Sequence, residues 1–353
     1  MKALVTGATG IIGSNLVRAL LATGYDVRVL LRAASDARSL AGLAIERCEG
    51  DVLEPETLDA AVQGCAVVFH AAAVFSYWGQ SAEALQDLAI GGTRNVLAAA
   101  RRAGSARVVV TSSSVVLGSS ATPGTRDEAA VFDEANPPAY TLSKLRQESA
   151  AFAIGAELGI EVVAVCPTLA IGPHDYRLSP SNAYIVNYFN DPFRSTFVGG
   201  CNFVSARDVA AGHILAAEKG TPGSRYVVGS ENTTWRQAHE LLSDLGGTFG
   251  PSVVLNHTAS YLAAMGAEIA ARLAGTRPAA TRDEAKMSTR FYWYEHERLA
   301  RLGYAPMPVR QALAEAMAWL LGRAYLADSV MEKLKLAPDV LTARALLSEG
   351  RLG

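Results

Sequence analysis

The sequence predicts a doubly wound α/β domain, in which helices cover both faces of a parallel sheet, followed by a smaller and mostly helical lobe. Short apolar strands alternate with amphipathic helices through the first half of the 353-residue chain. The strands are nearly continuous apolar runs, as expected of parallel strands buried on both faces. Helical crossovers of this length join parallel strands in the right-handed sense. We expect the parallel domain to span residues 1–172, with returning segments near 203–230. The lobe is then formed by 173–202 and 231–353.

Each element of the first half follows from its periodicity and its end signals. The predicted strands are 2–7, 26–32, 44–52, 66–73, 107–113 and 161–167. The predicted helices are 12–24, 35–42, 55–64, 81–103 and 139–158. Gly24 and Gly64 are typical helix C-terminal signals, and Pro55 suits a first helical turn. Ser35 is a suitable N-cap for the short helix that runs towards Gly42.

After Pro167, strands and helices no longer alternate regularly. Residues 173–202 are rich in proline, asparagine and aromatic residues, which predicts a loop-rich segment with one short helix. Residues 205–220 predict a helix and 225–230 a strand, and we expect both to return to the main sheet. Helices dominate from about Thr233 onward.

Composition argues against several functional classes. The net charge is −2 and the charges are interspersed, which gives little support to nucleic-acid or membrane-surface binding. No segment has the roughly 18 unbroken apolar residues of a membrane span. The four cysteines and six histidines are scattered, which favours free thiols and no metal site. We therefore expect a cytoplasmic protein with a small-molecule substrate.

A glycine-rich segment, TGATGIIG (6–13), directly follows the first predicted strand and opens the first helix. There Gly7 permits a sharp turn, Gly10 a close approach of backbone N–H groups to a pyrophosphate, and Gly13 tight helix–strand packing. A glycine-rich turn without a ligand shows the same triplet, but its place on the first βα turn favours dinucleotide binding. The expected cofactor contacts here are Thr6, Gly7, Thr9, Gly10, Ile11, Ile12 and Gly13.

The end of the second strand indicates which dinucleotide binds. NAD is usually held by a carboxylate about 20 residues beyond the glycines, whereas Arg32 occupies that place here. A guanidinium suits a 2′-phosphate, and Ser35 and Arg38 are candidate helpers. An ordinary strand-end arginine is the alternative. We predict a preference for NADP(H), with NAD(H) as the second choice.

The ends of the third and fourth strands supply further candidates. Asp51 is positioned to accept a hydrogen bond from adenine, with Val52 packing on the ring, although an aspartate here also suits a turn or helix cap. The small residues Ala71, Ala72 and Ala73 leave room for the ribose and nicotinamide. Close strand packing explains these alanines equally well.

Hydroxyl residues and a Tyr/Lys pair follow the fifth strand. The segment TSSSVVLG (111–118) places hydroxyls where ligands bind in such sheets, although serines also end strands. In YTLSK (140–144), Tyr140 and Lys144 share one helix face. Free tyrosine titrates near pH 10, and a nearby ammonium stabilises its phenolate. A solvated Tyr/Lys pair on a helix is the alternative.

These motifs together resemble the extended, atypical branch of the short-chain dehydrogenase/reductase superfamily, which includes the NAD-dependent epimerases and dehydratases. The resemblance covers nearly the whole chain, in order. The segments that carry it are TGATGIIG (6–13), GDV (50–52), VFHAAA (68–73), GTRNVLAAA (92–100), TSSSVVLG (111–118), YTLSK (140–144), PTLAIGP (167–173), FVSARDVAAGHILAAE (203–218) and LGYAPMPVRQALAEAMAWL (302–320).

The resemblance implies a Rossmann fold and a Ser/Tyr/Lys catalytic set. Tyr140 and Lys144 match the motif without ambiguity, and the serine position maps to Ser113, with Ser112 and Ser114 as alternatives. The implied cofactor contacts are Thr111, Tyr140, Lys144, Pro167 and Thr168.

Within the branch, PTLAIGP is similar to dihydroflavonol reductases, cinnamoyl-CoA reductases and bacterial relatives that reduce carbonyl groups with NADPH. Sugar dehydratases need an acid beside the catalytic serine, and TSSSVVLG contains none. SYWGQ (76–80) resembles a sugar-epimerase-like subgroup. We therefore predict an NADP(H)-dependent reductase of a ketone or aldehyde. A nucleotide-sugar epimerase with tightly bound NAD is the alternative, and a non-catalytic NADP-sensing protein is a remote third.

Three further expectations follow from the resemblance or from composition. Ala89 stands where the branch usually has an asparagine that supports the catalytic lysine, so the proton relay is expected to differ. Phe75, Trp78 and Tyr184 are candidate substrate contacts, although such aromatic residues also form cores. The helices near 81–103 and 139–158 form a dimer face in many relatives, which suggests a homodimer.

Overall fold

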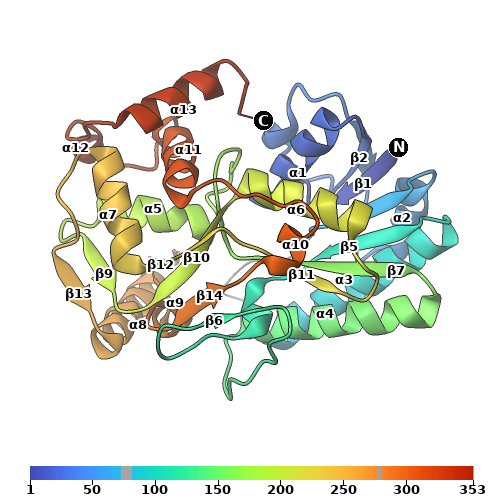
Figure 1. Ribbon diagram of the computed structural model, residues 1–353, viewed down its shortest axis with the longest axis horizontal. Coiled ribbons are helices and arrows are strands. Elements are labelled where there is room, and N and C mark those ends of the chain that lie inside the picture. Colours follow the sequence, from blue (N-terminus) through green and yellow to red (C-terminus); the bar gives the residue numbers. More distant parts are fainter. Residues whose placement is uncertain (73–81, 277, 279, 353) are drawn as a thin grey trace.

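A seven-stranded parallel sheet forms one half of the protein, as predicted (Figure 1). The computed structural model describes residues 1–72, 82–276, 278 and 280–352. Each strand pairs in parallel with its neighbours, so all seven carboxyl ends lie along one edge. Across the sheet, the strands are β11 (Arg225–Val228), β7 (Glu161–Pro167), β5 (Arg107–Thr111), β4 (Val67–His70), β1 (Lys2–Thr6), β2 (Asp26–Leu31) and β3 (Glu46–Glu49).

Helices cover both faces of this sheet, and each face has its own apolar core (Figure 1). One face carries α1 (Ile11–Ala22) and α6 (Ala206–Lys219). The other carries α2 (Pro55–Val62), α3 (Ala82–Arg102) and α4 (Ala139–Leu158). The chain therefore returns to the main sheet through α6 and β11, as the sequence indicated. Two 3₁₀ turns, η1 (Arg38–Leu40) and η2 (Ser114–Leu117), complete this half.

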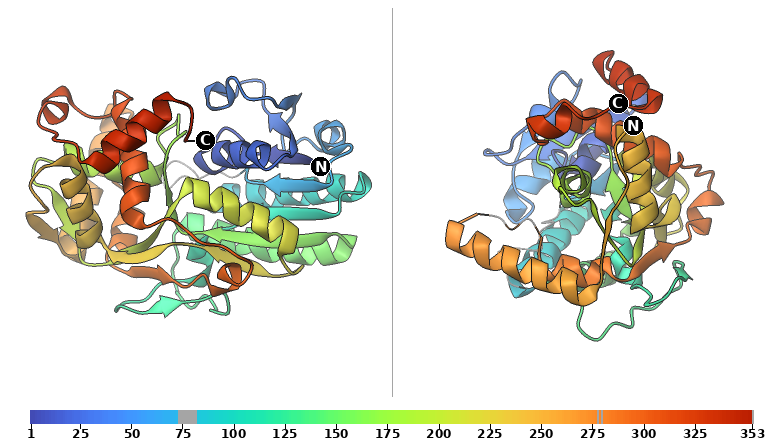
Figure 2. Two further views of the ribbon diagram at one scale, coloured as in Figure 1. Left: turned by 45° about the horizontal axis from the view of Figure 1, so that its top comes forward. Right: turned by 90° about the vertical axis from the view of Figure 1, so that its left-hand side faces the viewer.

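The lobe lies at the other end of the molecule and contains sheets as well as helices (Figures 1 and 2). Its larger sheet is formed by β12 (Glu231–Thr234), β10 (Gly200–Ser205), β14 (Phe291–Tyr294), β6 (Thr125–Arg126) and β8 (Leu169–Ile171). A two-stranded sheet pairs β13 (Val253–Leu255) with β9 (Ser195–Phe197). The helices of the lobe are α5 (Pro180–Asn190), α7 (Trp235–Gly246), α8 (His257–Ala274), α9 (Arg282–Ser288), α11 (Val309–Leu321), α12 (Asp328–Met331) and α13 (Pro338–Ser348). The short helix α10 (Glu297–Ala300) instead packs against β11 and α6 of the main-sheet half.

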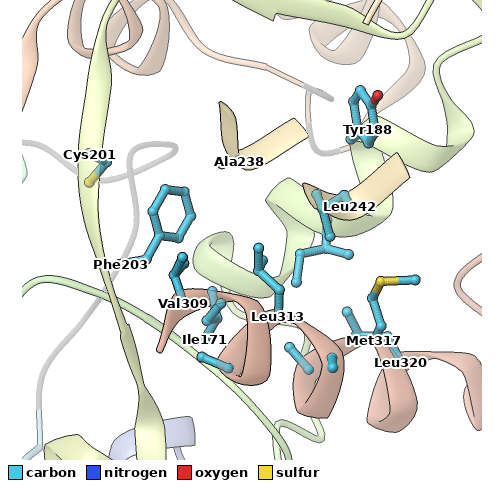
Figure 3. Close-up of a cluster of buried hydrophobic side chains, with 14 of the residues drawn as sticks. Ile171, Tyr188, Cys201, Phe203, Ala238, Leu242, Val309, Leu313, Met317 and Leu320 are labelled. Carbon is cyan, nitrogen blue, oxygen red and sulfur yellow. The ribbon is translucent and has the colours of Figure 1, made fainter. Parts of the chain in front are cut away.

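The lobe has a third apolar core, which lies between its larger sheet and its helices (Figure 3). Phe203 on β10 faces the apolar side of α11, where Val309 and Leu313 are buried. Leu242 on α7 closes the same cluster. Tyr140 of α4 also belongs to this core, so the helix that carries the Tyr/Lys pair contacts both halves of the protein.

The element ends agree with the sequence at most glycines and differ at Ser35. Gly24 and Gly64 follow α1 and α2 with φ of 82° and 76°, the left-handed region that glycine tolerates. The helix expected over 35–42 is only the short turn η1, whose N-cap is Ala37. Ser35 is therefore not the cap, because its own N–H closes a turn onto the carbonyl of Arg32 (2.8 Å). In the described part of the chain, no helix is long and apolar enough to cross a membrane.

Candidate active site

The glycine-rich turn after β1 has the shape of a phosphate cradle. Gly7 has φ of 71°, and a Cβ there would lie 2.5 Å from the carbonyl carbon of Ala71. A Cβ on Gly13 would lie 2.2 Å from the carbonyl oxygen of Gly7. Gly10 is the N-cap of α1 and has no side chain to occupy the first-turn N–H groups. The residues present therefore fit a dinucleotide pyrophosphate at this helix N-terminus.

The neighbours of this turn are held by side-chain hydrogen bonds. The hydroxyl of Thr6 accepts from the N–H of Ala72 (3.3 Å), which fixes the end of β4 beside the end of β1. Arg177, from the segment between β8 and α5, donates to the hydroxyl of Thr9 (2.6 Å). Arg177 was not predicted, because nothing in the sequence shows that this segment crosses the glycine-rich turn. Ile11 and Ile12 are half-buried at the start of α1.

Arg32 is exposed directly after β2, in the place predicted to select the cofactor. Arg38, a predicted helper, forms an ion pair with Asp36 (2.7 Å). That hydrogen bond from Arg38 lowers the pKa of Asp36 to about 2, with a smaller contribution from Arg177. The guanidinium groups of Arg32, Arg38 and Arg177 thus lie near the predicted adenosine end of the site, together with the carboxylate of Asp36.

The ends of β3 and β4 are shaped by packing. One carboxylate oxygen of Asp51 accepts from the N–H of Leu53 (3.0 Å), which is the turn role considered as its alternative. Val52 packs against α3, where a Cβ on Gly92 would lie 3.0 Å from its methyl group. Ala71 and Ala72 are half-buried beside Gly7. The predicted contacts Ala73, Phe75 and Trp78 lie outside the described residues.

Ser113 and Tyr140 lie together at the carboxyl edge of the sheet. Tyr140 is in the first turn of α4, and Ser113 directly precedes η2 after β5. Burial raises the pKa of Tyr140 to about 12, and a hydrogen bond with Ser113 opposes that shift. Ser114, an alternative candidate, is hydrogen-bonded to Tyr294 in the lobe. Ser113 is therefore the candidate serine that lies beside the Tyr140 hydroxyl.

Lys144 is 4 % exposed and lies one helical turn after Tyr140. Its Nζ donates to the carbonyl oxygen of Thr111 (2.9 Å) and to Oε1 of Gln147 (2.9 Å). Burial lowers the pKa of Lys144 to about 8, while Cys166 and Glu148 oppose this shift. The ammonium is therefore the predominant form at neutral pH and becomes scarce in mildly alkaline solution.

A buried chain of polar side chains leads from Lys144 back to the glycine-rich turn. Nε2 of Gln147 donates to the hydroxyl of Thr93 (3.1 Å), which bonds Nε2 of His70 (3.3 Å). Nδ1 of His70 bonds the hydroxyl of Thr6 (2.9 Å). Burial, with the charge of Lys144, lowers the pKa of His70 to about 3, so this imidazole is neutral. This series of hydrogen bonds is not predictable from the sequence, because its members come from β1, β4, α3 and α4.

The other predicted contacts have partners of their own. The hydroxyl of Thr111 bonds His213 on α6 (2.8 Å), and its carbonyl holds Lys144. Pro167 ends β7, and the hydroxyl of Thr168 donates to Asn202 on β10 (2.9 Å), which joins the two larger sheets. Tyr184 stacks on His239 in the lobe, with ring centroids 4.9 Å apart. This is the packing role considered as its alternative.

Comparison with known proteins identifies the family. Residues 3–229 match the model of the NAD dependent epimerase/dehydratase family. The chain belongs to this family. The matched residues include Ser113, Tyr140 and Lys144 and, except for Lys2, all seven strands of the main sheet.

Similar members of the family are named as reductases. The chain is 35 % identical to the Synechocystis sp. protein named "Putative dihydroflavonol 4-reductase", over 91 % of this chain and 95 % of that protein. It is 30 % identical to cinnamoyl-CoA reductase 1 of Oryza sativa subsp. japonica, over 91 % of each chain. The crystal structure of gox2253 aligns with a TM-score of 0.80 and 32 % identity, over 92 % of this chain and 99 % of that one.

A more distant relative shares the fold. The structure of PA4631, a nucleoside-diphosphate-sugar epimerase from Pseudomonas aeruginosa, aligns with a TM-score of 0.75 at 22 % identity. It covers 93 % of this chain and 99 % of that one. The same backbone thus serves proteins named as reductases and proteins named as epimerases.

Proposed function

We propose that this protein is an NADPH-dependent reductase that converts a ketone or aldehyde to an alcohol. The observation that carries the proposal is the hydrogen-bonded pair Ser113 and Tyr140, placed one helical turn from the buried Lys144. The pair lies at the same sheet edge as the glycine-rich turn. The names of the similar family members support reduction over epimerisation.

The three side chains divide the chemistry among them. When bound, NADPH supplies a hydride to the carbonyl carbon and becomes NADP⁺. Ser113 holds the carbonyl oxygen by a hydrogen bond, and Tyr140 donates its proton to that oxygen. The product is the alcohol, and the phenolate left behind is stabilised by the ammonium of Lys144. The high pKa of Tyr140 keeps the phenol protonated until the substrate oxygen becomes basic.

Preference for NADP is proposed from the charges around the end of β2. Arg32 is exposed there, and Arg177 lies beside the glycine-rich turn through its bond to Thr9. A guanidinium binds a phosphate through charge-assisted hydrogen bonds, whereas a ribose hydroxyl is usually held by a carboxylate. The carboxylate nearby, on Asp36, is already paired with Arg38.

The decisive experiment replaces Tyr140 by phenylalanine. The Tyr140→Phe variant keeps the ring in the core but removes the proton donor, so we expect kcat for a carbonyl substrate to fall about 10²–10⁴-fold. NADPH affinity, measured by fluorescence titration, should change little. Tyr25→Phe is the matched control. Tyr25 directly precedes β2, far from the carboxyl edge, and its hydroxyl donates to Glu218 on α6 (3.0 Å). Full turnover in Tyr140→Phe would reject the mechanism.

Cofactor content separates the alternatives. A reductase exchanges NADP(H) freely with solution, whereas an epimerase that oxidises and re-reduces one substrate retains NAD(H). The measurement is the nucleotide released when freshly purified protein is denatured. One retained NAD(H) per chain, without net carbonyl reduction, would favour an epimerase. NADPH binding without turnover of any carbonyl would favour a non-catalytic sensor.

A further inference from the structure

Gln147 is the side chain that contacts the ammonium of Lys144, and both are almost completely buried. Gln147 is 1 % exposed and lies three residues after Lys144 on the face of α4 that packs against α3. Its Oε1 is 2.9 Å from Nζ, and its Nε2 is 3.1 Å from the hydroxyl of Thr93 on α3. Position 89 of α3 is alanine and has no polar side chain to offer.

The orientation of this amide follows from the chemistry of its neighbours. A protonated lysine has three N–H donors and no acceptor, so the amide must present Oε1 to Nζ. Nε2 then points to α3, where the hydroxyl of Thr93 is an acceptor at 0 % exposure. A buried amide with an unpaired N–H would cost about 1–3 kcal/mol. The bond to Thr93 therefore prevents the amide from turning away from Lys144.

We propose that Gln147 is a positioning residue, which anchors the Lys144 ammonium to α3 and directs its remaining N–H towards the nicotinamide ribose. Thr111 and Gln147 take two N–H groups, and among the described residues the third has no acceptor. This inference rests on the proposed function, because it assigns the lysine a cofactor to hold. It predicts that the charge state of Lys144 depends on the acceptor at position 147.

Several other titratable groups surround Lys144, and none of the substitutions changes them. Tyr140 and Glu148 lie on α4, His70 ends β4, and Cys166 lies on β7. His70 stays neutral because its pKa is about 3. The thiol of Cys166 stays protonated because burial raises its pKa well above the usual range.

The test uses two substitutions of opposite electrostatic sign. Gln147→Met has similar length but removes the acceptor, which disfavours the ammonium; Gln147→Glu adds an opposite charge, which favours it. The probe is NADPH, titrated by fluorescence between pH 6.5 and 10. In the unmodified protein, affinity should fall as pH rises through about 8, where Lys144 loses its proton. We expect this fall to move down by about one pH unit in Gln147→Met and up by about one unit or more in Gln147→Glu.

A second readout needs no cofactor. The pKa of Lys144 is about 8 in the folded chain and about 10.4 when unfolded, so between these values the unfolded state binds more protons. The free energy of unfolding therefore gains a contribution that rises with pH through this window. The rise should begin at lower pH in Gln147→Met and at higher pH in Gln147→Glu. Urea unfolding from pH 7 to 9.5 measures it.

Two further variants complete the design. Thr93→Val removes the second bond of the amide and should move the NADPH profile in the direction of Gln147→Met, by a smaller amount. Ser143→Ala is the control, because the Ser143 hydroxyl donates to the carbonyl oxygen of Leu85 (3.1 Å) and not to Lys144. It should leave both profiles in place. If a Gln147 variant fails to fold, the shift of the NADPH profile in Thr93→Val tests the role of Gln147.

The outcomes separate this inference from the proposed function. Identical shifts in the two Gln147 variants, or no shift in either, would overturn the role of Gln147. Opposite shifts in unfolding with no change in the NADPH profile would overturn the link to the cofactor. Neither readout uses a carbonyl substrate. Failure of the Tyr140→Phe test would therefore reject the reductase while these shifts still report on Gln147.

Discussion

At the scale of single residues, the site holds a buried ammonium whose hydrogen-bond acceptors are neutral groups. An ammonium removed from water is tolerated only where its N–H groups find acceptors. Thr111 and Gln147 provide them, and the neighbouring His70 is kept neutral by burial. Lys144 thus stays charged near neutrality although it is surrounded by protein.

The cofactor preference is testable at Arg32. Loss of a charge-assisted hydrogen bond to the 2′-phosphate costs about 1.5–3 kcal/mol, so Arg32→Ala should raise the Kd for NADPH about tenfold or more. The Kd for NADH should hardly change, because NADH lacks that phosphate. Titration with both cofactors measures the ratio. Arg102→Ala is the control, since Arg102 at the end of α3 forms an ion pair with Asp59 on α2 (2.6 Å). Equal losses for the two cofactors would contradict the assignment.

The spacing of Tyr140 and Lys144 was readable because i, i+4 residues share a helix face wherever the helix lies. The role of Gln147 was not readable in the same way. Its i, i+3 position puts it near Lys144, but the amide orientation is set by Thr93, which is 54 residues away in the chain. For the same reason, nothing in the sequence near Thr9 indicated that Arg177 would bond it.

At the scale of elements, the first βα turn depends on close backbone contact. Gly13→Ala would place a methyl group 2.2 Å from the carbonyl oxygen of Gly7, so the turn must shift. We expect a loss of about 1–3 kcal/mol in the free energy of unfolding, together with weakened NADPH binding. Urea unfolding and fluorescence titration measure the two effects.

The control for this change is Gly266→Ala in α8. Among the described residues, no atom beyond the surrounding helical turns lies within 4 Å of a Cβ at that position, and alanine favours a helix over glycine by up to about 1 kcal/mol. This variant should be as stable as the unmodified protein or slightly more stable. Wild-type stability and NADPH affinity in Gly13→Ala would show that the turn is looser than the structure indicates.

Elements formed by local signals were predictable, and those formed by distant pairing were not. The parallel strands are apolar runs with helices between them, and each was placed from its own sequence. The larger sheet of the lobe was not predicted, because its strands come from distant parts of the chain. Strand β10 pairs with β14, about 90 residues later, and β14 also pairs with β6, which precedes both in the sequence. Its strand β12 reads ENTT, which has no apolar alternation that would predict a strand.

At the scale of the whole molecule, polar contacts connect the two halves around the site. Thr168 on the main-sheet side bonds Asn202 in the lobe, and Arg177 reaches the glycine-rich turn. Tyr140 is packed in the lobe core while Lys144 bonds the end of β5. Movement of the lobe would therefore alter the relative positions of Tyr140 and Lys144 directly.

The homodimer remains a prediction, and α4 provides its test. Ala153 is exposed on this helix, among other small residues that would allow two helices to approach closely. We expect light scattering to give twice the chain mass, and Ala153→Glu to give a single chain mass. Ala263→Glu, on exposed α8, should leave the dimer intact. A monomeric mass for the unmodified protein would contradict the prediction.

Leu352 is connected to the helix of the glycine-rich turn through two hydrogen bonds. Its carbonyl oxygen accepts a hydrogen bond from Nε2 of His174 (2.6 Å), and the carbonyl of His174 in turn accepts from Ser14 on α1 (3.1 Å). Leu352 is 3 % exposed, so a substitution at this position would act two hydrogen bonds from the helix of the glycine-rich turn.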